Sequence, residues 1–345
     1  MWFASRPNSR GLAVSQGKGL TPDQARISAI MESVETAYAE RCETLITEIC
    51  SLKQLMARHK TPVPFERLLR TASEAIDPRR KRGWVKGESW PDGATVYAPY
   101  ELVGIDYRDG VGWDHETFHM SSIGVAAHAD RERAIQHGLL EVIENDATAA
   151  VEVFGFSDRL VEFLPELPGS DALEAALGKL ARAGLAASFC RLRGAIDLPV
   201  IGCFVGRDVA GAEGSGTAYS AGFACRLRVE DAALSALLEA VQSRLTDIAG
   251  ARDDISPEDF RPANAEIGAW LPPSRLVAGS HPPRGEPLAV IGAALDEAGI
   301  EASYVFDLCA EPGLSVVRVL VPDMQSPASS AELRMGLTAT QQLLG

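Results

Sequence analysis

The stretch SSIGVAAHADRERAIQHGLLEVIENDA, residues 121–147, joins a strand-like run to an amphipathic helix. The run itself, TFHMSSIGVAA, covers residues 117–127, and Asp130 follows it as a good helix N-cap. The helix then carries apolar residues that favour burial, namely Leu139, Leu140, Val142 and Ile143. Because Glu141 and Glu144 lie among them one helical turn apart, the stretch predicts a strand-to-helix unit with two carboxylates beside a core.

A similar unit precedes it at residues 13–40, AVSQGKGLTPDQARISAIMESVETAYAE. Thr21 is a good N-cap, Pro22 suits the first helical position, and Gln24 completes a capping box. We expect the buried stripe of this helix to consist of Ile27, Ile30, Met31, Val34 and Tyr38. Two further carboxylates, Glu32 and Glu35, lie next to that stripe.

A third unit covers residues 216–250 and carries Glu239 and Gln242 on its helix. Later segments read as a helix and strands that complete an α/β core. Between the units, residues 77–95 are interpreted as a basic surface loop and residues 164–171 as a linker. Each of the three units thus presents an acidic residue followed, three positions later, by a carboxylate or an amide.

Composition restricts the possible partners of this chain. The 345 residues have a formal net charge of −14, which argues against nucleic acid, because phosphate backbones are bound by surplus Lys and Arg. The six cysteines form no CxxC pair, and there is no signal peptide or membrane-spanning run. The sequence therefore predicts a cytoplasmic protein with reduced thiols, no nucleic-acid partner and no membrane partner.

The paired carboxylates have two interpretations. An isolated ExxE pair is commonly a solvated helix face or part of a salt bridge. Three such pairs beside apolar stripes favour a site, because carboxylates at i and i+3 repel each other and a divalent cation removes the repulsion. Mg²⁺ prefers oxygen ligands and often shares them with phosphates, so five carboxylates suggest several ions on a nucleotide. A two-metal hydrolase would also use such a set, and Lys18 could contact a phosphate.

The chain resembles the YcaO family in three blocks. These are RPNSRGLAVSQGKGLTPDQARISAIMESVE at residues 6–35, residues 121–147, and SAGFACRLRVEDAALSALLEAVQSRLTDIAGARDD at residues 220–254. With the closing SVVRVLVPDM, the likeness covers nearly the whole chain, so we expect a single domain over residues 1–345. It implies the α/β fold of that family, in which helices converge on ATP and Mg²⁺.

The resemblance also implies site residues. The SxxxExxE motif corresponds to Ser28, Glu32 and Glu35, the ExxE motif to Glu141 and Glu144, and the ExxQ motif to Glu239 and Gln242. Together with Lys18, these residues are expected to bind the nucleotide. The metal ligands among them would be Glu32, Glu35, Glu141, Glu144 and Glu239. No residue is assigned a catalytic role.

The activity implied is phosphorylation of a peptide backbone amide oxygen with ATP, which gives an azoline or a thioamide in a ribosomally made peptide. The expected partners are a precursor peptide and an E1-like or TfuA-like protein, and a homodimer is possible. The chain begins inside the first conserved block, shows no fused partner domain, and ends in TATQQLLG without a Pro-rich tail. These features favour the thioamide branch or a divergent role.

Two departures from the family pattern support a second hypothesis. Asn145 and Ser235 stand where arginines are usual, and neither can replace a bidentate charged contact to phosphate. The alternative is therefore a divergent homologue with weakened or no ATPase activity, which would act as a binding or scaffolding subunit of a peptide-modifying complex.

Overall fold

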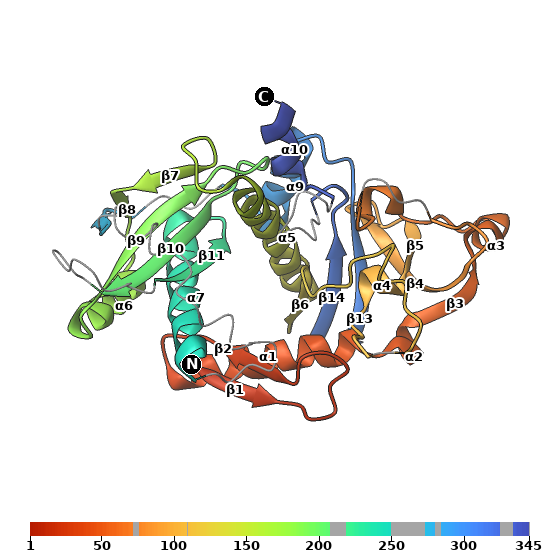
Figure 1. Cartoon of the computed structure of the whole chain (residues 1–345), viewed down its shortest axis with the longest axis horizontal. Helices are drawn as coiled ribbons and strands as arrows, with labels where there is room; N and C mark the ends of the chain where they lie inside the picture. The colour runs from red at the N-terminus through yellow and green to blue at the C-terminus, as the bar shows by residue number, and fades with distance from the viewer. Residues whose placement is uncertain are drawn as a thin grey trace. The chain divides into compact units, whose positions relative to one another are not determined.

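A computed structural model of the chain (Figure 1) describes residues 1–71, 76–108, 110–207, 219–249, 273–279, 284–324 and 334–344. Its contacts divide the chain into two compact units, each built from separate segments. The first unit consists of Met1–Ser5, Val14–Ile30 and Phe156–Gly285. The second consists of Arg6–Ala13, Met31–Gly155 and Glu286–Gly345.

The first unit is built on an antiparallel sheet of four strands. Their order is β11 (Ser220–Cys225), β10 (Val200–Arg207), β9 (Leu185–Leu192) and β7 (Val161–Leu164). Helix α7 (Val229–Ala249) lies along β10 and β11, and α6 (Asp171–Arg182) packs on β9 (Figure 1). Two short pairs complete the unit: β1 (Trp2–Ser5) with β2 (Val14–Gly17), and β8 (Glu166–Pro168) with β12 (Arg275–Val277).

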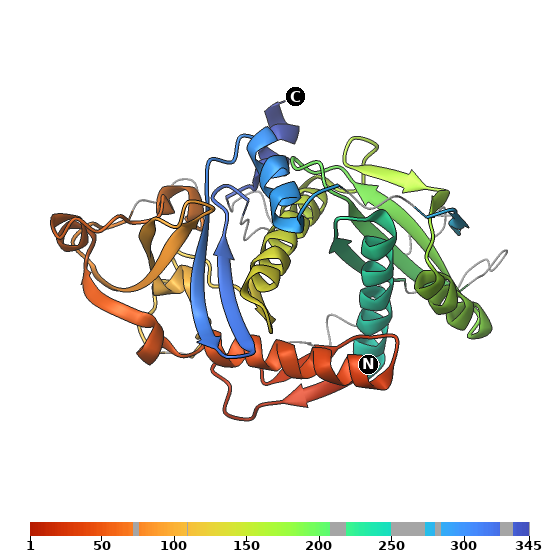
Figure 2. The same ribbon diagram turned by 180° about the vertical axis from the view of Figure 1, so that it is seen from behind.

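The second unit is built on a larger antiparallel sheet. Its order is β3 (Ile46–Ser51), β4 (Lys81–Trp90), β13 (Ser303–Glu311), β14 (Leu314–Leu320) and β6 (Val125–His128), and β5 (Thr95–Pro99) pairs with β4. The blue strands β13 and β14 lie side by side (Figure 2). Gly313 joins them with a φ of 77°, a left-handed conformation that glycine adopts without strain.

The helices of this unit begin and end at residues with clear signals. The 24-residue α5 (Arg131–Phe154) is capped by Asp130, which accepts a hydrogen bond from Arg133 N at 3.0 Å, as predicted. It ends at Gly155, whose φ is 75°. The other helices are α2 (Cys42–Leu45), α3 (Leu52–Ala57), η1 (Phe65–Leu68), α4 (Tyr100–Val103), α9 (Pro287–Glu297) and α10 (Leu337–Leu344).

Helix α1 (Pro22–Ala39) confirms the predicted capping box and corrects the predicted stripe. Gln24 N donates to Thr21 Oγ1 at 3.2 Å, and Thr21 N donates to Gln24 Oε1 at 3.3 Å. However, Ile27 and Ile30 are 57% and 49% exposed. The buried face of this part of α1 consists of Ala25 and Ala29 instead, because β2 approaches the helix too closely for larger side chains. Met31, Val34 and Tyr38 do pack on the core of the second unit.

Other segments also differ from the sequence-based interpretation. Residues 77–95 were expected to form a surface loop, yet most of them form β4, where Trp84 and Val85 are buried. The expected linker at 164–171 contains β8. The strand expected at 117–127 is confined to Val125–His128.

The structure shows the state of the cysteine thiols and the apolar character of the helices. All six cysteines are free thiols. Among the described residues, none of the helices combines the length and apolar character needed to cross a membrane.

Candidate functional site

Helix α1 carries the first motif. Ser28 Oγ accepts a hydrogen bond from Lys18 N at 3.3 Å. One turn further along, Glu32 is exposed, and Glu35 is half-buried and accepts from Ala127 N at 2.7 Å. Glu35 is therefore fixed against β6 of the sheet in the second unit.

Helix α5 carries the second motif, with Glu141 and Glu144 both half-buried. Glu141 Oε2 accepts a hydrogen bond from Gly124 N at 3.2 Å. This contact depends on the close approach of α5 to β14, which Gly138 allows: a Cβ at Gly138 would lie 2.7 Å from Val319 Cγ2 and 3.0 Å from Gly124 O. A glycine in the helix thus determines how near Glu141 comes to the sheet.

Glu141 is close enough to Glu35 to affect the ionisation of Glu35. The pKa of Glu35 lies well above its ordinary value, first because the carboxyl is buried and then because Glu141 and Glu32 place negative charge beside it. The hydrogen bond from Ala127 N opposes this shift. A carboxylate set of this kind has the oxygen donors and the negative charge that suit Mg²⁺.

Arg318, on β14, is a charged neighbour that sequence reasoning missed. Its side chain is 2% exposed, and Nη1 donates to Ser121 O at 2.6 Å. Burial lowers the pKa of Arg318 to about 10, while the negative charge of Glu141 opposes that shift. One basic residue in the apolar run SVVRVLVPDM was the signal that could have identified it.

Helix α7 carries the third motif in the first unit. Lys18 Nζ lies 2.5 Å from Glu239 Oε2, and each side chain is about one-third exposed. Gly222 allows this helix to approach β11, since a Cβ there would lie 2.4 Å from Ala236 O. One turn along the helix, Gln242 Nε2 donates to Gln16 Oε1 at 3.3 Å. Within the described residues, the buried Gln242 Oε1 has no hydrogen-bond partner, so this oxygen remains available as an acceptor.

The structure brings some predicted residues together within each unit. In the first unit, Lys18 contacts both Ser28 and Glu239. In the second unit, Glu35 interacts electrostatically with Glu32 and Glu141. Over the described ranges, no three or more His, Cys, Asp or Glu side chains are arranged to hold a metal ion. The donor chemistry and the charge balance fit Mg²⁺, whereas the complete ligand set stays a prediction.

The two positions that lack the usual arginines are both described. Asn145 lies on α5, and its buried Oδ1 has no hydrogen-bond partner among the described residues. Ser235 is half-buried on α7. Neither residue supplies positive charge.

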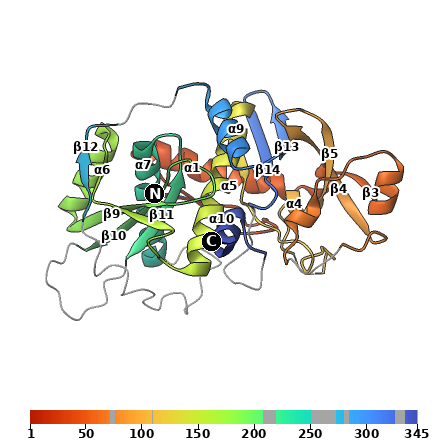
Figure 3. The same ribbon diagram turned by 90° about the horizontal axis from the view of Figure 1, so that it is seen from above.

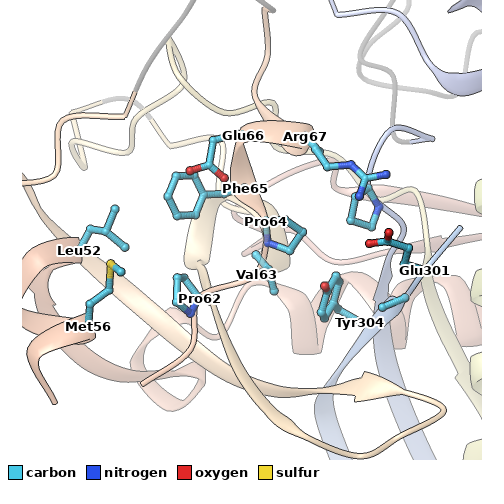
Figure 4. Close-up of a pocket in the computed structure, with 12 residues that line it drawn as sticks. Leu52, Met56, Pro62, Val63, Pro64, Phe65, Glu66, Arg67, Glu301 and Tyr304 are labelled. Atoms are coloured by element: carbon cyan, nitrogen blue, oxygen red, sulfur yellow. The ribbon is translucent and has the colours of Figure 1, made fainter. Parts of the chain in front are cut away.

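A separate pocket of about 350 Å³ lies in the second unit (Figure 4). Leu52 and Met56 line one end, and Arg67 and Glu301 line the other. Arg67 is held there by an ion pair with Asp323. None of the predicted site residues lines this pocket, so it is distinct from the carboxylate motifs.

Comparison with families and relatives gives consistent results. The family model described as YcaO cyclodehydratase, ATP- and Mg²⁺-binding, matches residues 16–325. A Rhizobium leguminosarum bv. trifolii protein, described as an uncharacterized protein in the tfuA 3′ region, is 30% identical over 361 residues, which covers 99% of this chain and 84% of that protein. A Methanothermobacter thermautotrophicus protein is 29% identical over 350 residues, with 94% and 85% covered.

Solved structures show the same fold. YcaO from Methanopyrus kandleri, bound with AMPPCP and Mg²⁺, has a TM-score of 0.65 at 26% identity, covering 94% of this chain and 82% of that one. A heterocyclase in complex with substrate and cofactor has a TM-score of 0.68 at 18% identity. That match covers 90% of this chain but 45% of the heterocyclase chain, so it shows a likeness of fold alone.

Proposed function

This chain belongs to the YcaO family, and from that premise we propose that it uses ATP and Mg²⁺ to activate a peptide backbone amide by phosphorylating its oxygen. The observation that carries the proposal is the pairing of Glu35 with Glu141. These carboxylates come from two different helices, and burial followed by the charge of Glu141 raises the pKa of Glu35. A bound cation would remove that repulsion.

The overall reaction converts the amide oxygen into a leaving group. A nucleophile would add to the amide carbon and lose its proton, and the amide oxygen would take the γ-phosphoryl group of ATP and leave ADP. The C–O bond would then break with release of phosphate. The remaining proton would leave the amide nitrogen when a C=N bond forms, or the sulfur when a C=S bond forms. The product is an azoline when the nucleophile is a neighbouring Cys, Ser or Thr side chain, and a thioamide when it is a sulfide source. When bound, ATP and Mg²⁺ supply the phosphoryl group and the positive charge that offsets developing negative charge.

The chain's own part is to bind and orient. We assign metal binding to the carboxylates of the three motifs, Glu32, Glu35, Glu141, Glu144 and Glu239. Two of them are already oriented by backbone amides: Glu35 by Ala127 N and Glu141 by Gly124 N. Such contacts reduce the side-chain entropy that is lost when a ligand binds.

Nucleotide contacts are assigned to Ser28, Lys18 and Gln242, in addition to the carboxylates. The Lys18 ammonium forms an ion pair with Glu239. A cation bound by Glu239 would release Lys18 to meet a phosphate oxygen. Gln242 Oε1, which has no partner in the described part of the chain, would accept a hydrogen bond from the nucleotide.

A second candidate function is a binding or scaffolding subunit with weakened or no ATPase activity. Asn145 and Ser235, which stand where arginines are expected, favour it. Both candidates allow the peptide complex to form. They differ in whether ATP is turned over.

The partners and setting are proposals of the same kind. The relative described as lying in the tfuA 3′ region supports a TfuA-like partner beside the precursor peptide. An E1-like protein is the alternative partner. The proposal also includes a cytoplasmic location and one family domain over residues 1–345, and it allows a homodimer. The genes that flank the coding sequence would select between the azoline and thioamide branches.

Calorimetric titration of the full chain with ATP and Mg²⁺ tests the nucleotide site. Glu144→Gln should abolish Mg²⁺-dependent ATP binding, because it removes a ligand charge. Glu132→Gln is the matched control, since this exposed carboxylate lies in the first turn of the same helix. If Glu144→Gln leaves the affinity unchanged, the motif carboxylates are structural. If no Mg²⁺-dependent binding occurs even with partner and peptide present, the enzyme proposal is wrong.

A further inference from the structure

Asp146 is a buried charged residue on α5 to which the proposed mechanism gives no role. It is 1% exposed and follows the ExxE motif by two positions. Its Oδ2 accepts a hydrogen bond from Thr338 N at 3.0 Å and another from Thr338 Oγ1. Thr338 lies in the first turn of the C-terminal helix α10, where a carboxylate is favoured by the helix dipole.

The Asp146 side chain leaves α5 in a different direction from Glu141 and Glu144. At about 100° per residue, Asp146 projects roughly 170° away from the mean direction of Glu141 and Glu144. Glu141 meets Gly124 N just before β6, and Gly138, about 60° from Glu141 around the helix, faces Val319 on β14. The Asp146 side faces α10, which packs against α5 (Figure 3). Helix α5 is therefore held by the sheet and by α10 at different positions around its axis.

Helix α10 is itself anchored to another part of the second unit. Arg334, which is 8% exposed, donates from Nε to Leu69 O at 2.8 Å and from its backbone N to Arg70 O at 2.9 Å. These contacts fix the segment that leads into α10. The position of Thr338 beside Asp146 is therefore fixed by the contacts of Arg334.

We propose that Asp146, through Thr338, is a positioning residue that fixes the rotation of α5 about its axis and so aims Glu141 and Glu144. The apolar contacts of a helix allow small rotations, whereas the two directional hydrogen bonds that Asp146 Oδ2 accepts from Thr338 favour one orientation. A rotation of α5 would separate Glu141 from Gly124 and misdirect both motif carboxylates. This inference rests on the proposed function for its effect on metal binding, but not for its effect on the Glu141 contact.

The test uses Thr338→Val and Asp146→Asn in the full chain, with two readouts. The first is the ¹H–¹⁵N resonance of Gly124, whose amide reports the Glu141 contact without any ligand. The second is the affinity for Mn²⁺ alone, used as a probe of the carboxylates. We expect Thr338→Val to shift the Gly124 resonance and to weaken Mn²⁺ binding about tenfold, which is typical for supports of metal ligands. Thr338→Ser, which keeps the hydroxyl, should restore both.

Thr340→Ala is the control, because Thr340 is exposed on the same helix and its hydroxyl donates within its own segment, to Gly336 O at 2.9 Å. It should leave both readouts unchanged. An unmoved Gly124 resonance in folded Thr338→Val and Asp146→Asn would overturn the proposal. If the wild-type chain binds neither Mn²⁺ nor Mg²⁺-ATP, the proposed function fails, while the Gly124 resonance still decides the positioning role.

Discussion

At the scale of single residues, Glu35 predicts how stability depends on pH. Its pKa is raised in the folded chain, so the folded chain keeps a proton at pH values where the unfolded chain has lost it. The free energy of unfolding of the metal-free protein should therefore fall as pH rises from the ordinary glutamate range through the raised pKa. Each unit of difference between the folded and unfolded pKa corresponds to about 1.4 kcal/mol.

Glu35→Gln should remove this dependence. The amide oxygen can still accept from Ala127 N, but it cannot ionise. Denaturation without metal should show the variant to be more stable than the wild type at alkaline pH, with a difference that shrinks toward acidic pH. Glu132→Gln, at an exposed position, should keep the wild-type pH profile. Parallel profiles for wild type and Glu35→Gln would contradict the assigned electrostatics.

At the scale of secondary-structure elements, the contact of α5 with β14 predicts the effect of a single methyl group. Alanine is a better helix former than glycine by up to about 1 kcal/mol. At Gly138, however, the added Cβ would lie 2.7 Å from Val319 Cγ2, so the helix must move away from the strand. Gly138→Ala should therefore lower the melting temperature and weaken Mg²⁺ binding through Glu141.

Gly178→Ala on α6 is the matched control. Its new Cβ would meet only Arg182 Nη1, at 3.7 Å, so the gain in helix propensity should appear as a small rise in melting temperature. Thermal denaturation of both variants checks the pair. Equal stabilisation at the two positions would show that α5 can move without cost.

The sequence predicted elements whose signals are local. The starts of α1 and α5 follow from Thr21 and Asp130, which cap the helices through hydrogen bonds three residues away. The sequence-based prediction was wrong for β4, because the basic run at residues 79–82 resembles a solvated loop. In the structure, Arg82 is buried and paired with Asp114, a partner 32 positions away that no local pattern reveals. Strand β8 was missed for the same reason, since it pairs with β12 about a hundred residues later.

At the scale of the whole molecule, motif spacing predicted which residues could form a site but not how each is held. Glu35, Glu141 and Glu239 are named by the motifs alone. Their supports are not: Ala127 N, Gly124 N and Lys18 Nζ come from other elements and become visible only after folding. Arg318 was missed because its relation to Glu141 depends on the pairing of β14 with β6 and the packing of α5 on them.

Turnover at the scale of the whole molecule depends on the chain together with its partner protein and peptide. Asn145 and Ser235 remove two expected positive charges, so the chain alone should bind Mg²⁺-ATP but release phosphate slowly. Adding a TfuA-like or E1-like partner together with the precursor peptide should raise phosphate release, because amide and phosphate are then held in one orientation. Phosphate assays and mass spectrometry of the peptide check this, since an azoline loses water and a thioamide exchanges oxygen for sulfur. Mg²⁺-ATP binding in the full mixture, without phosphate release or peptide modification, would favour the scaffolding alternative.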